Sequence, residues 1–66
     1  MKGIVQRLVS DRGFGFVQGE DGRDYFVHRS AVSSPGGFDT LAEGDPVSFD
    51  GRNGPKGLRA ENVTKG

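Results

Sequence analysis

The sequence predicts an all-β fold in which five short antiparallel strands close into a small barrel. The 66 residues include 12 glycines and only 32 % hydrophobic residues, a composition that suits short strands joined by tight turns. No segment shows the apolar periodicity of an amphipathic helix. Closing the sheet leaves no exposed strand edge, which favours a barrel. One small domain, residues 1–66, is all that this length can hold.

Residues 2–9 are predicted to form the first strand, because Ile4, Val5 and Val9 are β-branched residues that favour extended backbone. Strict alternation along this strand would place Arg7 on the same face as Val5. A guanidinium group buried there without a partner would be costly. We therefore expect a bulge or a strong twist near Arg7 that turns its side chain outward.

A second and a third strand are predicted at residues 14–18 and 25–28. The segment between them, residues 19–24, is polar and contains the pair Asp21-Gly22, which is typical of the turns that close hairpins. The two strands are therefore expected to pair with each other as an antiparallel hairpin.

Alternation along this hairpin gives it two different faces. One face carries three aromatic rings and an imidazole: Phe14, Phe16, Phe26 and His28. The other face carries the better apolar lining for a small barrel: Val17, Tyr25 and Val27. Although phenylalanine is usually a core residue, we expect these rings to be exposed, where they can stack on the bases of an unpaired nucleic-acid strand. The neighbouring Gly13 and Gly15 are expected to let a ligand approach the backbone.

The second half of the chain is predicted to contain two more strands, at residues 47–49 and 58–63. Residues 29–32 can form one helical turn after the hairpin. Residues 33–45 begin with a stretch of Ser, Pro and Gly and are expected to form a long loop. Residues 50–57, with three glycines and a proline, are expected to form a flexible turn.

The charge distribution is uneven although the total is balanced. Nine Lys and Arg residues cancel nine Asp and Glu residues, where a nucleic-acid-binding domain usually has a basic excess. Residues 31–50 contain four acids and no Lys or Arg, whereas residues 51–66 contain four cations against Glu61. The pattern permits a basic sector opposite an acidic one, and a local basic region steers a polyanion even on a neutral protein.

The residue types exclude several classes of function. The chain has no Cys and one His, so it offers neither a disulfide framework nor a set of metal ligands. Gly13-Phe14-Gly15 fails the dinucleotide fingerprint, because Gln18 stands where its third Gly belongs. No pairing of nucleophile and base can be named, so we expect no enzyme activity, no cofactor and no metal. No apolar run reaches the length of a membrane span, and a cytoplasmic location without membrane contact is expected.

Two motifs carry a family resemblance. Residues 12–17 (Arg-Gly-Phe-Gly-Phe-Val) and residues 25–28 (Tyr-Phe-Val-His) resemble the two nucleic-acid-binding motifs of the cold-shock domain. The resemblance extends over nearly the whole chain, through Phe38 in the long loop to residues 60–64. It implies an OB-fold-like, five-stranded barrel, a single cold-shock domain over residues 1–66, that binds single-stranded RNA or DNA. By the same resemblance we expect an RNA chaperone or transcript regulator that limits secondary structure, often in cold or stress.

The residues and the resemblance together predict a nucleic-acid-binding site of rings, cations and one carboxylate. Its members are Arg7, Arg12, Phe14, Phe16, Asp24, Phe26, His28, Arg29, Phe38 and Lys56. The rings are expected to stack bases, the cations to neutralise phosphates or lie on base planes, and Asp24 to read base edges. Phe38 is either a stacking lid or a plug on the barrel end, and the resemblance favours the lid. The family usually has Trp where this chain has Arg7, and many members have an aromatic residue where it has Arg29.

Two other interpretations have some support. Residues 12–17 also resemble the signature of the RNA-recognition motif, but that fold needs two helices and an aromatic residue where Gly19 stands. A protein-interaction barrel that has lost nucleic-acid binding would fit the zero net charge and the missing Trp. Lys56 and Arg59 could also be ordinary solvated residues, and Arg59 is not part of the predicted site. A monomer is expected, with the loop over residues 33–45 as a potential hinge for a strand-exchanged dimer.

Overall fold

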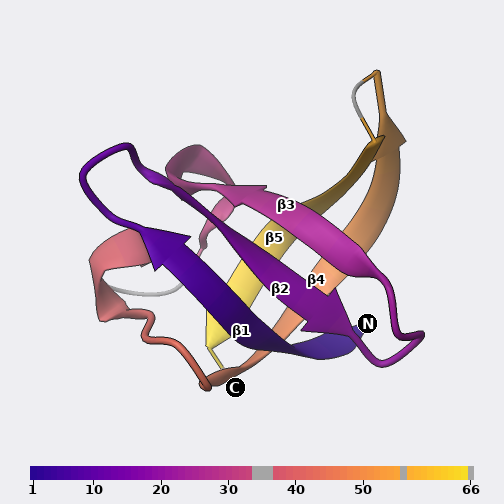
Figure 1. Ribbon diagram of the computed structural model, residues 1–66, viewed down its shortest axis with the longest axis horizontal. Coiled ribbons are helices and arrows are strands. Elements are labelled where there is room, and N and C mark those ends of the chain that lie inside the picture. The colour runs from indigo at the N-terminus through magenta and orange to yellow at the C-terminus, as the bar shows by residue number, and fades with distance from the viewer. Residues whose placement is uncertain (34–36, 56, 66) are drawn as a thin grey trace.

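The computed structural model describes residues 1–33, 37–55 and 57–65. In it, short segments separated by glycine-containing turns form five β-strands. The strands are β1 (Lys2–Val9), β2 (Phe14–Gly19), β3 (Asp24–His28), β4 (Pro46–Gly54) and β5 (Gly57–Lys65). They close into a barrel in the order β1-β2-β3-β5-β4, and in Figure 1 the first three strands lie in front of the last two. The predicted five-stranded barrel is confirmed.

The contact between β3 and β5 that closes the barrel is parallel, whereas the four other strand pairings of the described residues are antiparallel. The predicted antiparallel barrel is confirmed, with this one pair as its exception. The reason is topological, because strand directions cannot alternate at every pair around a closed ring with an odd number of strands. Phe26 lies opposite Arg59 in this pairing, and a further parallel bridge joins Val32 to Val63.

β1 contains the irregularity expected near Arg7. Its pairing with β2 steps from Val5 opposite Val17 to Arg7 opposite Phe16, so Gln6 is the extra residue of a β-bulge. Val5 is buried and Arg7 is exposed. The bulge resets the alternation of side chains and turns the guanidinium group outward, as the cost of burying it predicts.

The barrel interior is filled by apolar side chains from all five strands and from the loop before β4. Among the described residues, the buried hydrophobic side chains are Val5, Val17, Tyr25, Val27, Phe38, Leu41, Val47, Phe49, Ala60 and Val63. This set confirms the predicted inward face of the β2–β3 hairpin. With the interior filled in this way, the opposite face of the same hairpin is directed away from the core.

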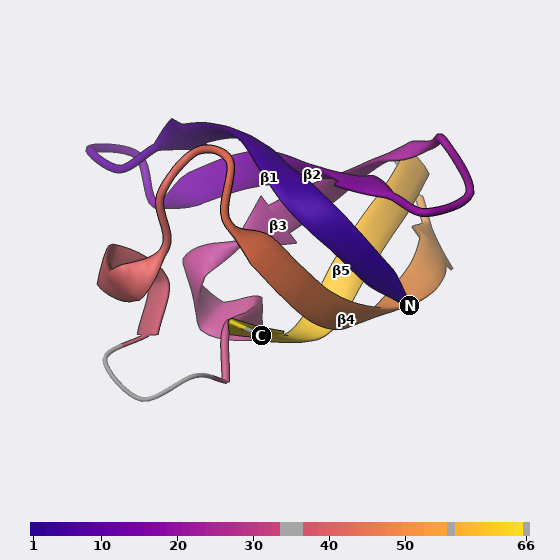
Figure 2. The same cartoon turned by 90° about the horizontal axis from the view of Figure 1, so that it is seen from below.

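Two short 3-10 turns, η1 (Arg29–Ala31) and η2 (Gly37–Thr40), connect β3 to β4. The first confirms the helical turn predicted for residues 29–32, and the second lies inside the segment predicted as a loop. In Figure 2 both turns lie at one end of the barrel, and the β2–β3 and β4–β5 hairpins extend at the other. No helix within residues 1–33, 37–55 and 57–65 is long and apolar enough to cross a membrane.

β4 is longer than the sequence predicts. Residues 50–54 pair with residues 57–61 of β5, where the composition indicates a flexible turn over residues 50–57. That prediction is wrong because most side chains of this extension are exposed and polar, so no apolar alternation marks them as strands. The extension still packs against the barrel at Gly51. The backbone there lies so close to the Tyr25 ring that an added Cβ would be only 2.8 Å from it.

Candidate nucleic-acid interface

The outer face of β2 and β3 carries three phenylalanine rings in mutual contact. The ring centroids of Phe14 and Phe26 lie 5.6 Å apart, with 27° between the planes. Phe16 stands edge-on to both, with its centroid 6.1 Å from that of Phe14 and 5.8 Å from that of Phe26. All three are half-buried, so they stabilise one another while part of each ring stays accessible. Their predicted position outside the core is confirmed; together with His28 we call them the ring surface.

A row of side chains crosses four strands at the middle of this face. Arg7 of β1 lies opposite Phe16 of β2, which in turn lies opposite Phe26 of β3. On the other side of Phe26, β5 contributes Arg59. Residues directly opposite each other in a sheet project on the same side, so the row consists of two rings between two guanidinium groups.

Within residues 1–33, 37–55 and 57–65, no ion pair joins a cation around the ring surface to a carboxylate. Among the residues that the structure describes, ion pairs join Arg52 to Glu61 at 3.8 Å and Lys65 to Asp45 at 3.3 Å. Neither pair includes a cation of the ring surface. The exposed cations that lie in or beside it are Arg7, Arg12, Arg29 and Arg59. A chain of zero net charge therefore still presents a locally basic surface to a polyanion.

His28 extends the ring surface at the end of β3, where it lies opposite Phe14. Its Nδ1 accepts a hydrogen bond from the Ser30 backbone N–H at 3.2 Å and lies 2.8 Å from Ser30 Oγ. A backbone N–H can only donate, so this geometry assigns the lone pair to Nδ1 and the ring proton to Nε2. The imidazole, held by η1, thus has its Nε2–H as a donor for a ligand.

Arg12 and Arg29 lie at the edge of the ring surface, beside Gly13. A Cβ at Gly13, whose φ is +75°, would lie 2.9 Å from Cδ of Arg29. The Arg29 backbone N–H also donates to the Gly13 carbonyl at 2.8 Å. Gly15 instead faces β1, where a Cβ would lie 2.5 Å from the Arg7 carbonyl oxygen. Both glycines therefore allow the chain to pack closely on itself, which corrects the expectation that they make room for a ligand.

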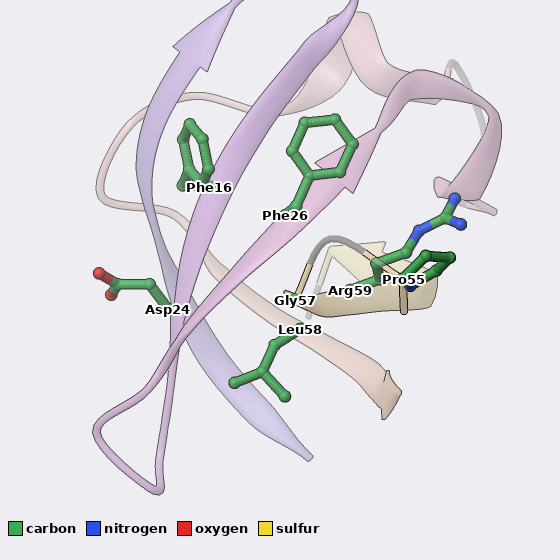
Figure 3. Close-up of a pocket in the computed structure, with 7 residues that line it drawn as sticks. All are labelled: Phe16, Asp24, Phe26, Pro55, Gly57, Leu58 and Arg59. Atoms are coloured by element: carbon green, nitrogen blue, oxygen red, sulfur yellow. The ribbon is translucent and has the colours of Figure 1, made fainter. Parts of the chain in front are cut away.

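A groove of about 620 Å³ opens beside the rings, where β3 meets the β4–β5 hairpin (Figure 3). Its lining is mainly apolar, with one carboxylate and one guanidinium group: Phe16, Asp24, Phe26, Pro55, Gly57, Leu58 and Arg59. In Figure 3 the rings of Phe16 and Phe26 project side by side, and Asp24 and Arg59 lie on opposite sides of the groove. A mainly apolar groove with few polar groups is the usual form of a small-ligand subsite.

Most of the predicted binding residues lie on this surface or at its edge: Arg7, Arg12, Phe14, Phe16, Asp24, Phe26, His28 and Arg29. Phe38 does not, because it is only 7 % exposed and packs in the core with Leu41. The structure corrects the lid interpretation of Phe38 in favour of the plug. Lys56 lies outside the residues that the structure describes.

Arg59 is the site residue that sequence reasoning missed. It stands between half-buried Leu58 and buried Ala60 in β5, and this alternation was a signal that its side chain points outward. Nothing in the sequence indicates that Arg59 lies beside Phe26, because the parallel pairing that brings them together joins distant segments of the chain.

A hydrogen bond at the turn of the β2–β3 hairpin orders the strands that carry the rings. The Tyr25 hydroxyl donates to Asp21 Oδ2 at 2.6 Å, and the Arg23 backbone N–H donates to Asp21 Oδ1 at 3.0 Å. The bond from Tyr25 is the main reason that the pKa of Asp21 lies below its ordinary value of 3.8. The same bond raises the pKa of Tyr25, because the hydroxyl must keep its proton to donate.

The fold and this surface together define a class of protein. Partly exposed rings flanked by cations on a barrel face suit single-stranded nucleic acid, because only unpaired bases offer their faces for stacking. The chain belongs to the cold-shock domain family: the family model described as the "'Cold-shock' DNA-binding domain" matches residues 1–66. This is a family of nucleic-acid-binding proteins rather than of enzymes.

Named relatives agree with this assignment. The chain is 49 % identical over 61 residues to Cold shock protein 2 of Lactiplantibacillus plantarum, covering 92 % of this chain and 91 % of that protein. It is 47 % identical over 64 residues to Cold shock protein CspC of Bacillus subtilis, covering 97 % and 96 %. The Major cold shock protein of Streptococcus pyogenes serotype M1 is 44 % identical over 64 residues, covering 97 % and 94 %. The chain is thus a single-stranded nucleic-acid-binding protein, and a protein-interaction barrel is not favoured.

Proposed function

We propose that the protein binds single-stranded RNA or DNA and acts on RNA as a chaperone or transcript regulator that limits secondary structure. The observation that carries this proposal is the row in which Phe16 and Phe26 lie between Arg7 and Arg59 on an exposed sheet face. Rings take the base faces and guanidinium groups take the phosphates or further base planes. The relatives named as cold shock proteins support a role under conditions in which RNA secondary structure becomes more stable.

The rings act on bases that have no partner. Phe14, Phe16, Phe26 and His28 each stack on one base of a strand that crosses the ring surface, at about 1–3 kcal/mol per stacked base. In a duplex these faces are covered by neighbouring base pairs, so the surface has no comparable interaction with double-stranded RNA. Binding to the unpaired form alone shifts the folding equilibrium of an RNA hairpin toward the open form by mass action.

The cations act on the backbone of the strand. Arg7 and Arg29 occupy positions where the family often has aromatic residues, and a guanidinium plane can stack on a base as well as pair with a phosphate. Arg12 adds charge at the turn before β2, and Asp24 accepts hydrogen bonds from base edges. Lys56 is proposed as a further phosphate contact from its sequence position alone. Binding through these cations should weaken as salt is added.

One copy of the chain is sufficient for this function. The ring surface lies on adjacent strands of the same chain, β2 and β3, with a cation from each neighbouring strand. We therefore propose a monomer as the active form, acting on transcripts in the cytoplasm.

Fluorescence anisotropy with a labelled short oligopyrimidine tests single-strand binding. We expect binding that weakens with salt and is lost in the variant Phe14→Ala/Phe16→Ala, whose fold is checked by circular dichroism. Ile4→Ala is the matched control, because Ile4 is exposed and apolar but is not a ring of the site. Displacement of the strand by an equal nucleotide concentration of duplex would contradict the proposal.

A labelled RNA hairpin tests the chaperone role separately. With a fluorophore and a quencher at its two ends, the hairpin should open at lower temperature as protein is added, and the double variant should have no effect. Tight binding of single strands without any change in hairpin melting would mean that the protein binds single strands but is not a chaperone.

A further inference from the structure

Asp24 and Arg59 flank the groove beside the rings without pairing with each other. Both line it, and Figure 3 places them on opposite sides. Within the described part of the chain, neither belongs to an ion pair, and both residues are exposed. The groove therefore has an anionic acceptor on one side, a cationic donor on the other and apolar walls between them.

The spacing of these two residues suits a flat base. Asp24 stands two residues before Phe26 in β3, and Phe26 lies opposite Arg59 in β5. With about 3.3 Å per residue along a strand and about 4.8 Å between strands, the two backbone positions are about 8 Å apart. A base stacked on Phe26 would then have one edge toward the carboxylate and another toward the guanidinium group.

Guanine is the base whose edges complement this pair of charges. Its Watson–Crick edge carries the N1–H and N2–H₂ donors side by side, and a carboxylate can accept from both. Its major-groove edge carries the O6 and N7 acceptors, to which arginine donates two hydrogen bonds in its commonest base-specific contact. One guanine would thus make two hydrogen bonds with each charged side chain of the groove.

The other bases lack this combination of edges. Adenine and cytosine each have one amino group beside a ring-nitrogen acceptor, so a carboxylate would gain one hydrogen bond and face a lone pair. Uracil and thymine have a single N–H between two carbonyl oxygens, which a carboxylate would oppose on both sides. Only guanine combines two adjacent donors with two adjacent acceptors.

We propose that this groove is a guanine-selective subsite, in which Asp24 binds the Watson–Crick edge of the base and Arg59 binds O6 and N7. The inference rests on the proposed single-strand binding and adds the base that one position of the strand prefers. A guanine within a pyrimidine-rich strand would then set the register in which that strand lies on the ring surface.

Anisotropy titrations with a set of labelled oligothymidylates test the subsite. The strands carry at one internal position thymine, adenine, guanine, inosine or 7-deazaguanine. One guanine should tighten binding about tenfold relative to one adenine. Inosine lacks the 2-amino group that would bind Asp24, and 7-deazaguanine lacks the N7 that would bind Arg59, so each should lose part of that gain.

Two variants assign each edge of the base to its partner. In Asp24→Asn, guanine and inosine should bind with nearly equal affinity, while 7-deazaguanine still binds more weakly. In Arg59→Gln, guanine and 7-deazaguanine should become nearly equal, while inosine still binds more weakly. Arg52→Gln is the matched control, because Arg52 lies opposite Arg59 in β4 but does not line the groove.

The outcomes separate this inference from the function on which it rests. Equal affinity for the guanine and adenine strands, with oligothymidylate still bound, would overturn the guanine subsite and leave single-strand binding intact. A guanine preference that survives both substitutions would place the base elsewhere and also overturn the assignment. Failure of the folded protein to bind any strand would overturn the proposed function itself.

Discussion

Phe16 and Phe26 face each other across β2 and β3, with their ring centroids 5.8 Å apart and their planes inclined at 73°. This edge-to-face contact holds both rings in place before any ligand arrives. Side chains that are already ordered lose less rotamer freedom on binding, and this favours affinity. The same pair therefore contributes to the hairpin and to the surface that the hairpin presents.

Truncation of Phe16 should affect binding more than stability. Phe16→Ala removes one stacking ring, so binding of a short oligopyrimidine should weaken by about 1–3 kcal/mol in anisotropy titrations. Val27→Ala, on the buried face of the same hairpin, should instead cost about 2 kcal/mol of unfolding free energy in urea. If Phe16→Ala lost stability without losing affinity, the ring would be structural only.

Replacement of Arg7 by the aromatic residue usual in the family should change how binding responds to salt. Arg7→Trp exchanges a charge for a larger stacking surface opposite Phe16. The loss of one phosphate contact should reduce the slope of log affinity against log salt by about 0.7 for a single strand. Affinity at high salt should rise, because stacking does not depend on counterion release.

Titrations of the wild type and Arg7→Trp at several salt concentrations give both quantities. Lys2→Gln is the charge-matched control, since Lys2 lies at the far end of β1, opposite Ser48 of β4. Identical slopes for Arg7→Trp and the wild type would mean that Arg7 does not contact a phosphate.

Alternation of side chains explains how much of the site the sequence could predict. Each hairpin residue has its direction fixed by its neighbours, so period two placed the rings on one face and Val17 and Val27 on the other. The choice of the ring face as the outward one rested on the better apolar set of the opposite face and on the family resemblance. The bulge that exposes Arg7 followed from the cost of burying a guanidinium group. The division of the hairpin into two faces and the position of the bulge needed only residues adjacent in sequence.

The features that the sequence did not predict depend on contacts between distant segments. Arg59 lies beside Phe26 through the parallel pairing of β3 with β5, which the pattern of neighbouring residues in the sequence cannot reveal. Phe38 stands in a glycine-rich loop that resembles a mobile lid, yet its ring is buried in the core. The extension of β4 over residues 50–54 is polar and exposed, so it lacked the apolar alternation that identifies a strand.

The Asp21–Tyr25 hydrogen bond should make stability depend on pH in the acid range. Because the pKa of Asp21 is lower in the folded protein than its ordinary 3.8, the carboxylate stabilises the fold fully above that value. This contribution is lost as the pH falls through the folded pKa. Urea denaturation of the wild type from roughly pH 7 to pH 2 should therefore show stability that declines below about pH 5, where a paired carboxylate begins to lose its contribution.

Asp21→Asn isolates this contribution. The amide still accepts a hydrogen bond from Tyr25 but does not titrate, so the variant should lose less stability on acidification than the wild type does. Asp39→Asn is the control, since Asp39 is exposed and lies in η2 at the other end of the barrel. An acid profile of Asp21→Asn that matches the wild type would show that another group governs the transition.

Substitution of Phe38 should distinguish a core plug from a stacking lid. The side chain is 7 % exposed and packs with Leu41 against the barrel interior, so Phe38→Ala should cost about 3–5 kcal/mol of unfolding free energy. A domain of this size has little stability to lose, and that variant can unfold. Phe38→Leu keeps most of the apolar volume and should cost less than about 1.5 kcal/mol. If the Phe38 ring is a plug, the Phe38→Leu variant should bind a short oligopyrimidine as tightly as the wild type. If the ring is a lid, this variant should lose affinity and keep its stability.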